Sequence, residues 1–276
     1  MSDQAARAQR FLDLHRPGQP LLMPNPWDVG SARLLASLGF EALATTSSGF
    51  AATLGRLDGT VTRDEALAHT ADLVAATPLP VSADLENGFA DRAAGVGETA
   101  AAAVAAGLAG FSIEDSSGQT EAPIFELEVA VERVAAAAAA AHRGAARVVL
   151  TARCENHLHG RDDLADTIAR LRAYESAGAD VLYAPGLTSA PDIEAVVKAV
   201  RLPVNVLALA GGPSVGELAA LGVSRVSVGG AFAFAALGAV VEAAQELREH
   251  GTYGYTARAA AGGKAARRAF GSQPPG

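Results

Sequence analysis

The sequence of 276 residues has only one cysteine, Cys154, so it can form neither an intrachain disulfide nor a cysteine-rich zinc site. It also lacks any run of ~18 consecutive apolar residues, the length that a membrane-spanning helix needs. No apolar core of signal-peptide length occurs near its amino terminus. These absences predict a cytoplasmic protein with no membrane partner.

Basic residues are scarce as well. The 22 Lys and Arg are outnumbered by 30 Asp and Glu, which gives a net charge of −8. An acidic surface repels phosphate backbones, so we expect no nucleic-acid partner. A small anionic substrate stays possible, because a metal ion and one buried arginine can reverse the sign of the charge locally. Half of the residues (50%) are apolar, enough for a large core.

The main positive signal is an alternation of short β-rich runs with Ala-rich stretches of helical composition. Eight β runs are expected, at residues 21–26, 42–47, 81–85, 111–114, 148–153, 181–184, 204–208 and 226–228. Eight such units favour a closed parallel barrel over an open doubly wound sheet. No GxGxxG or GxxxxGK[ST] loop follows the first run, which weakens a nucleotide-binding alternative. We therefore predict an α/β protein, with one (β/α)8 TIM-type barrel domain over residues 1–276.

Helix boundaries support this reading. A helix expected at residues 62–76 begins with Thr62 and has Glu65 three residues later, the capping-box pattern. After the eighth run, residues 235–276 are predicted to form a C-terminal helical extension. This extension is longer than barrel closure requires, so it either packs on a neighbouring subunit or ends as a solvated basic tail.

Acidic residues gather where the predicted strands end, which is where (β/α)8 barrels carry their active sites. The third run ends in SADLENG, which places Asp84 and Glu86 on one side of an extended chain. The fourth run ends with Glu114 and the fifth with Arg153. Carboxylates on adjacent strand ends repel one another unless a cation holds them, and oxygen-only ligation suits Mg²⁺ or Mn²⁺. We predict a metal site at Asp84, Glu86 and Glu114; the alternative is that these residues only cap the following helices.

Other polar residues near the strand ends give weaker signals. The planar donor fork of Arg153 could hold a substrate carboxylate or form a structural ion pair with Glu114 or Glu155. In the segment TTSSGFAATLGRLDG, serine hydroxyls and backbone amides could donate to an anion. Cys154 is expected to be a small core residue, and His157 and His159 to be surface or packing residues.

Six motifs follow one another in order over residues 21–230: PNPWDVGSARL, TTSSGFAATLGRLDG, SADLENGFAD, IED, ARCEN and VNVLALAGGPSVGELAALGVSRVSVGG. In this order the chain resembles the isocitrate lyase and phosphoenolpyruvate mutase superfamily, as a carboxyvinyl-carboxyphosphonate phosphorylmutase-like member. The resemblance implies a barrel whose last helix is exchanged between subunits of a homodimer or homotetramer. It also implies Mg²⁺ held most directly by Asp84, with Glu86 and Glu114 acting partly through water.

The resemblance further implies a small 2-oxo acid substrate and assigns roles to residues around it. Asp58, Arg153 and Glu114 take the catalytic roles, with Asp58 near the metal shell. The residues expected to bind substrate are Trp27, Ser48, Gly49, Phe50, Arg153 and Asn205.

One departure from the family pattern concerns the loop after the fourth strand. Isocitrate and methylisocitrate lyases carry a lid motif of the type KKCGH there, whose cysteine protonates the departing enolate, whereas this chain has EDSSGQTEAPIF. The lysine and the Asn-Ser pair of the mutase branch are also missing. The chain is thus expected to be a Mg²⁺-dependent lyase that decarboxylates or cleaves an oxaloacetate-like 2-oxo diacid through a metal-stabilised enolate.

Three other functions stay open. The first is a retro-aldol or retro-Claisen lyase for a larger 2-hydroxy or 2-oxo diacid, with Ser116, Ser117 or Glu121 moving the proton. The second is a noncatalytic 2-oxo acid binding protein. The third is a phosphonopyruvate-type P–C hydrolase.

Overall fold

The computed structural model of the protein describes residues 3–271, and its sheet has eight parallel strands in the order β1-β8-β7-β6-β5-β4-β3-β2. The strands are β1 (Leu21–Met23), β2 (Leu43–Ala44), β3 (Val81–Asp84), β4 (Gly110–Glu114), β5 (Val149–Arg153), β6 (Val181–Tyr183), β7 (Val204–Leu207) and β8 (Arg225–Ser227). Between the two ends of this order, the Ala44 amide donates to the Pro24 carbonyl at 3.1 Å, so the barrel is nearly closed. The predicted (β/α)8 fold is confirmed.

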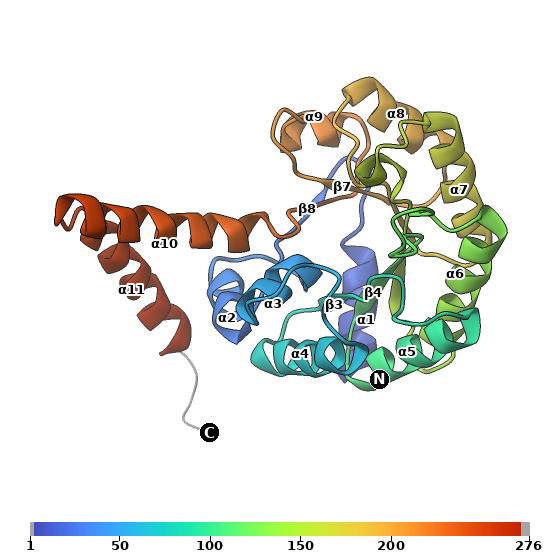
Figure 1. The fold of residues 1–276 in the computed structure, drawn as a ribbon. Helices are drawn as coiled ribbons and strands as arrows, with labels where there is room; N and C mark the ends of the chain where they lie inside the picture. Colours follow the sequence, from blue (N-terminus) through green and yellow to red (C-terminus); the bar gives the residue numbers. More distant parts are fainter. Residues whose placement is uncertain (1–2, 272–276) are drawn as a thin grey trace.

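Helices alternate with the strands, and those from α2 to α9 surround the barrel, whereas α10 and α11 extend away from it (Figure 1). The helices are α1 (Asp3–Asp13), α2 (Val29–Ser37), α3 (Ser47–Thr53), α4 (Arg63–Ala76), α5 (Ala93–Ala105), α6 (Leu127–Ala141), α7 (Leu164–Ser176), α8 (Ala190–Ala199), α9 (Val215–Ala220), α10 (Ala231–His250) and α11 (Thr256–Phe270), with a 3-10 turn η1 (Asn156–His159). The predicted capping box of α4 is confirmed, since Glu65 accepts from the Thr62 amide at 2.9 Å. Among the helices described, none is long and apolar enough to cross a membrane.

Each strand differs from its predicted run by one to three residues at one or both ends, and two of these differences affect the site. The second run was expected to reach residue 47, but Ser47 begins α3 because the Thr46 hydroxyl caps that helix by accepting from the Gly49 amide at 3.4 Å. The eighth run was expected to begin at Val226, but Arg225 already belongs to β8. This one-residue shift places an arginine inside the barrel.

Side chains alternate along each strand between the barrel interior and the surrounding helices. On β4, Phe111 and Ile113 are fully buried in the apolar layer between the sheet and the helices. Ser112 of the same strand lines a pocket inside the barrel, and so do Ser82 of β3 and Ser227 of β8. The interior above the barrel floor is therefore polar, and the apolar core lies outside the sheet.

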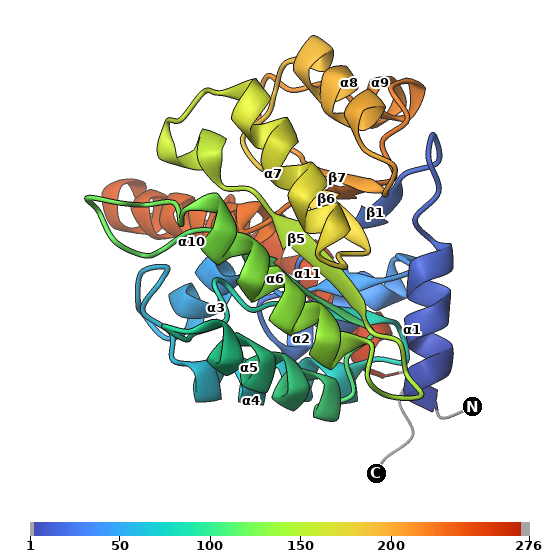
Figure 2. The ribbon, with the colours of Figure 1, turned by 90° about the vertical axis from the view of Figure 1, so that its right-hand side faces the viewer.

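The amino end of the barrel is sealed by α1, which lies at the end opposite to the loop after β4 (Figure 2). Phe11 of α1 is fully buried in an apolar cluster with Leu21, Val149 and Val181. It lies so close to β4 that a Cβ on Gly110 would come within 2.5 Å of its ring. The polar interior consequently has a closed apolar floor and opens only at the carboxyl ends of the strands.

At the other end of the chain, α10 leaves the barrel and projects away from it, and α11 folds back towards α2 (Figure 1). The predicted extension at residues 235–276 thus consists of most of α10 and all of α11, with residues 272–276 outside the described part of the chain. Because α10 does not lie against the barrel, Leu22 on the outer face of β1 stays 43% exposed. Val240 and Val241 of α10 are 64% and 54% exposed.

The role of Phe11 can be tested by truncation. We expect Phe11→Ala to lower the free energy of unfolding by about 3–5 kcal/mol, since it opens a cavity under the barrel that its neighbours cannot fill. Urea denaturation followed by circular dichroism measures the change. Leu57→Ala is the control, because that side chain is 83% exposed. Equal effects of the two substitutions would show that α1 does not seal the barrel.

Candidate active site

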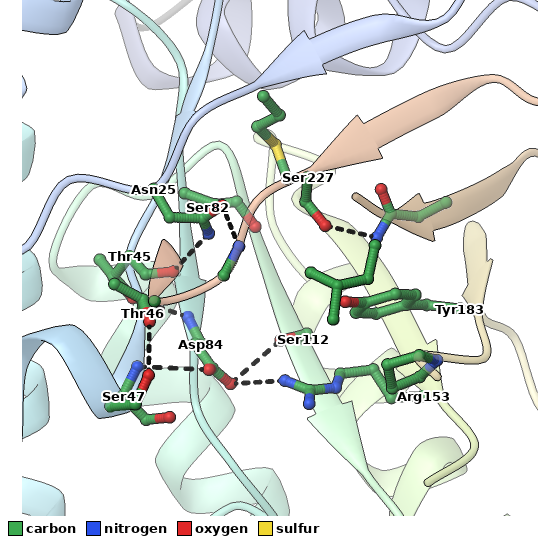
Figure 3. A pocket seen from close by; sticks show the side chains of 18 of the residues that line it. Asn25, Thr45, Thr46, Ser47, Ser82, Asp84, Ser112, Arg153, Tyr183 and Ser227 are labelled. Carbon is green, nitrogen blue, oxygen red and sulfur yellow. Dashed lines mark hydrogen bonds and ion pairs between the residues drawn. The ribbon is translucent and has the colours of Figure 1, made fainter. Parts of the chain in front are cut away.

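Two pockets adjoin at the carboxyl ends of the strands. The inner pocket, of about 190 Å³, reaches down into the barrel past Ser82 and Ser112 (Figure 3). The outer pocket, of about 470 Å³, lies beside it and extends to the loop after β4. Both are lined by Ser47, Asp58 and Arg153, which therefore mark the passage between them.

Asp84 ends β3 at this passage and is fixed by its surroundings. Its own amide donates to the Thr45 hydroxyl at 2.8 Å. One carboxylate oxygen accepts from Arg153 at 3.1 Å, and the other faces the Ser47 amide at 3.4 Å (Figure 3). Charged and backbone donors hold this carboxylate in one orientation, as a binding site requires.

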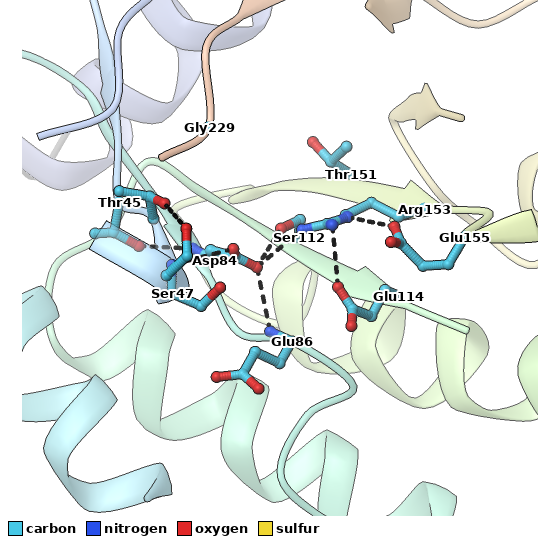
Figure 4. Close-up of polar contacts among 12 residues, drawn as sticks. Thr45, Ser47, Asp84, Glu86, Ser112, Glu114, Thr151, Arg153, Glu155 and Gly229 are labelled. Atoms are coloured by element: carbon cyan, nitrogen blue, oxygen red, sulfur yellow. Dashed lines mark hydrogen bonds and ion pairs between the residues drawn. The ribbon is translucent and has the colours of Figure 1, made fainter. Parts of the chain in front are cut away.

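Arg153, at the end of β5, contacts three carboxylates with its three guanidinium nitrogens (Figure 4). Besides Asp84, it contacts Glu114 at 3.2 Å and Glu155 at 2.8 Å. Both ion pairs named as a structural alternative from the sequence are thus present. The guanidinium carbon also lies 5.3 Å from the ring centre of Tyr183, close enough for a cation–π contact.

Carboxylates nevertheless outnumber the positive charge here. Burial, followed by repulsion from Asp84 and Asp58, raises the pKa of Glu86 to about 8. Burial also raises the pKa of Asp58, and it raises the pKa of Glu114 well above its ordinary value although Arg153 opposes the shift. Glu86 is held with φ at +48°, an uncommon conformation for a residue with a side chain and one that clusters at functional sites.

The carboxylates at the rim outnumber the one arginine that contacts them, and this excess bears on whether the site could hold a metal ion. In residues 3–271, no three Asp, Glu, His or Cys side chains converge closely enough to hold an ion, and Arg153 lies between Asp84 and Glu114. The donor atoms are all oxygens and their charge exceeds that of the arginine, which is the chemistry that Mg²⁺ and Mn²⁺ prefer. The residues fit such an ion in chemistry, and the ligand set Asp84, Glu86 and Glu114 stays a prediction.

The predicted substrate-binding residues are divided between the pocket and its wall. Ser48 and Asn205 line the inner pocket, together with Asp58 and Arg153. Gly49 packs beside Trp27, because a Cβ on Gly49 would lie 3.2 Å from the Trp27 Cβ.

The Phe50 ring is stacked 3.8 Å from His69, and its amide donates to the Thr46 carbonyl within α3. Among the residues described, Trp27, Gly49 and Phe50 are not part of the pocket lining.

A buried network behind the site fixes the ends of β4 and β5. Asp115 is 2% exposed and accepts from the Glu155 amide at 2.8 Å and from Tyr174 at 2.6 Å. It also pairs with Arg170 at 3.2 Å. Cys154 lies fully buried in the core, as expected, and burial raises the pKa of its thiol. This network positions Arg153 and Glu155 from behind.

Sequence reasoning missed Tyr183 and Arg225, both of which line the inner pocket. Tyr183 gave no signal, because an aromatic residue is ordinary in a β run. Arg225 was detectable, since a basic residue within the apolar run GVSRVSV must either end a strand or point into the barrel. Placing the start of the strand one residue late concealed it.

A (β/α)8 barrel with an acidic pocket at its strand ends defines a broad class, and comparison with known proteins narrows it. Residues 11–248 match the family model described as phosphoenolpyruvate phosphomutase. The chain belongs to this family, within the phosphoenolpyruvate mutase and isocitrate lyase superfamily that its motifs resemble.

Three relatives illustrate the family. A solved structure of a candidate lyase/mutase from Burkholderia cenocepacia J2315 is 56% identical with a TM-score of 0.94, covering 99% of this chain and 98% of that one. An oxaloacetate decarboxylase from a Bradyrhizobium species is 32% identical over 80% of this chain and 78% of its own. A 2,3-dimethylmalate lyase structure is 28% identical with a TM-score of 0.82, covering 92% and 90%. Because relatives of this kind are lyases and mutases, we expect this protein to be an enzyme as well.

The raised pKa of Glu86 predicts how stability depends on pH in the metal-free protein. Glu86 keeps its proton in the folded state up to about pH 8, whereas the unfolded chain loses it near 4.5, so stability is lost as the pH rises through 8. His69 titrates at lower pH, because its pKa falls from 6.5 in the unfolded chain to about 4 in the folded protein. Measurements above about pH 6.5 therefore report the loss due to Glu86 alone among these two groups. We expect the free energy of unfolding to fall from about pH 6.5 to about pH 8, and Glu86→Gln to flatten that fall.

Urea denaturation in EDTA at several pH values across this window measures both proteins. Glu217→Gln is the control, because that exposed carboxyl has its pKa lowered by Ser214 and is already ionised there. A fall with the same slope in the Glu86→Gln protein would contradict the assignment.

Proposed function

We propose that this protein is a divalent-metal-dependent lyase that decarboxylates or cleaves a small 2-oxo diacid of the oxaloacetate type. The observation that carries the proposal is the carboxylate cluster around Arg153, beside a pocket of about 190 Å³. One arginine can bind the acid, and the surplus carboxylates suit a cation. The oxaloacetate decarboxylase and 2,3-dimethylmalate lyase relatives support a lyase on such acids.

Each residue of the cluster has a role in this proposal. Asp84, Glu86 and Glu114 would hold Mg²⁺ or Mn²⁺, which supplies Lewis-acid stabilisation of the negative charge that develops when the bond breaks. Arg153 binds and orients the acid with its planar donor fork. Asp58 faces both pockets with its pKa raised by burial, so it can hold or release a proton at the passage.

A retro-aldol or retro-Claisen lyase for a larger diacid is the second candidate, and one contact favours it. In the loop after β4, the Ser116 hydroxyl lies 3.4 Å from Nε2 of His159, and both residues line the outer pocket. This pair can carry a proton to a departing fragment without a lid cysteine. Product analysis separates the candidates, because decarboxylation yields carbon dioxide and retro-aldol cleavage yields two carbonyl or carboxylic fragments.

The proposal predicts that Mg²⁺ and a 2-oxo diacid together raise the heat-denaturation midpoint more than either does alone, because each completes the binding site of the other. Compounds that stabilise the protein are then tested for turnover. Asp84→Ala should abolish the joint stabilisation and the metal-dependent turnover. Cys154→Ser should keep most of both, since the thiol is buried away from the pocket.

The alternatives give different results in the same experiment. Stabilisation without loss of substrate over hours indicates a noncatalytic 2-oxo acid binding protein, and release of inorganic phosphate from phosphonopyruvate indicates a P–C hydrolase. If neither metal nor any acid shifts the midpoint, the carboxylate cluster is structural and the proposed function is wrong.

We also propose that the subunit is part of a homodimer or homotetramer in which α10 is exchanged. A pocket of about 520 Å³ follows the outer face of β1, with Leu22, Leu38 and Val215 in its lining. The helix after the eighth strand of a barrel normally covers this region. Because α10 projects away with exposed apolar residues, α10 of a second subunit is the proposed cover.

A charge placed on α10 tests the exchange. We expect the double change Val240→Glu and Val241→Glu to shift the molecular mass in solution to that of a monomer, because two buried carboxylates cannot be accommodated in an apolar interface. Analytical ultracentrifugation measures the mass. Lys198→Glu, at an exposed position of α8, is the control. An unchanged oligomer in the α10 variant would mean that subunits do not associate through this helix.

A further inference from the structure

The register of the barrel places a continuous row of polar side chains from the rim to the interior. Arg153 is paired with Tyr183, Tyr183 with Asn205, and Asn205 with Arg225 across β5 to β8. Paired residues of neighbouring strands point to the same side of the sheet, and all four line the inner pocket. Because barrel strands are tilted, such a row descends along the barrel, from Arg153 at the strand ends to Arg225 at the start of β8.

Arg225 is a buried cation with only neutral partners. Arg225 is 2% exposed. Its guanidinium group contacts Nε2 of His15 at 3.1 Å and the Thr151 hydroxyl at 3.1 Å. Nδ1 of His15 lies 2.7 Å from the Phe11 carbonyl, and burial lowers the pKa of His15 to about 3, so this histidine is neutral. Within residues 3–271, no carboxylate lies at ion-pair distance from Arg225.

Two buried polar atoms at this end of the pocket also lack a partner in the described chain. One is Nε of Arg225, and the other is the side-chain oxygen of Asn205, a residue only 1% exposed. The Asn205 nitrogen donates to Ser227 at 2.9 Å, but a serine hydroxyl can equally donate, so the amide can present either atom to the pocket. Buried polar groups are rarely left unpaired in folded proteins, and a buried unpaired charge is costly.

The two pockets differ in charge. The outer pocket is lined by Glu86, Glu114 and Glu155 in addition to the shared Asp58 and Arg153, whereas the inner pocket balances Asp58 and Asp84 with two arginines, Arg153 and Arg225. Arg225, which starts β8, is the arginine that has no carboxylate partner in the described chain. Burial lowers the pKa of Arg225 to about 9; Tyr183 opposes this shift, and the positive charge of Arg153 adds to it. The outer pocket therefore suits a cation, and the part of the inner pocket around Arg225 suits an anion.

We propose that Arg225 and Asn205 bind the second carboxylate of the substrate at the inner end of the pocket. The substrate is then a dicarboxylate that lies along the polar row, with its 2-oxo acid end at Asp84 and Arg153 and its other carboxylate at Arg225. This inference rests on the proposed function for the rim end and adds a residue that selects diacids over monocarboxylic 2-oxo acids.

The test compares a short and a long acid in the presence of Mg²⁺. Oxalate can occupy only the rim end of the pocket, because its two carboxylates are directly joined and cannot also reach Arg225. Oxaloacetate carries a second carboxylate on a longer chain, which can extend towards Arg225. For Arg225→Met we expect the apparent Kd of oxaloacetate to rise about 10–100-fold, the loss that follows removal of a hydrogen bond to a charged group, while the Kd of oxalate changes less than about twofold. Ligand-dependent heat-denaturation midpoints give both constants.

Two further variants keep the test decisive if Arg225→Met folds poorly. Arg225→Lys keeps the charge but not the fork, so it should recover part of the affinity for oxaloacetate. Ser224→Ala is the matched control, because Ser224 is the preceding residue, is 1% exposed and is not in the described lining of the pocket. It should leave both constants unchanged.

The outcomes separate the two proposals. If oxalate binds and oxaloacetate binds the Arg225→Met protein as tightly as the unchanged protein, or if Arg225→Lys recovers none of the affinity that Arg225→Met loses, the inner carboxylate position is overturned and the proposed rim chemistry stands. If the unchanged protein binds neither acid with Mg²⁺, the proposed function fails and this inference fails with it.

Discussion

The site depends on one buried guanidinium that holds carboxylates from three parts of the barrel rim together. Without Arg153, Asp84 and Glu114 would face each other and Glu155 across a partly dehydrated space, where repulsion is strong. The arginine neutralises only part of this negative charge, and the raised pKa of Glu86 reflects its burial together with the carboxylate charge that stays uncompensated. A site with uncompensated negative charge is suited to bind a cation together with an anionic substrate, because the two charges compensate each other.

The barrel can accommodate these buried charges because its apolar packing and its polar interior are separate. Phe111 and Ile113 face outward and carry the core, so the inward positions are free to be Ser112 and its polar neighbours. The apolar cluster around Phe11 closes the other end of the barrel. Stability is therefore concentrated outside the sheet and beneath it, and the polar interior is left for binding.

The strand ends were predictable because polar residues there follow directly after apolar runs. Asp84, Glu86 and Arg153 could all be placed at the rim from that pattern, and the structure brings Asp84 and Arg153 into contact at 3.1 Å. Arg225 was not placed in the same way, since it lies at the start of its strand rather than at the end, and the predicted run began one residue later. Phe50 was read as part of an anion cradle, and its stacking on His69 is a contact between α3 and α4 that no local pattern encodes.

By itself the sequence determined the family of fold, because the period of apolar runs fixes eight strands and the helices between them. It also determined which chemistry is available at the rim, since carboxylates and one arginine follow the strands in a fixed order. The tertiary structure decided which of these groups meet. Strand tilt and register set the row from Arg153 to Arg225, and the departure of α10 from the barrel leaves the outer face of β1 uncovered. Both are long-range properties, fixed by how distant segments pack rather than by any local run of residues.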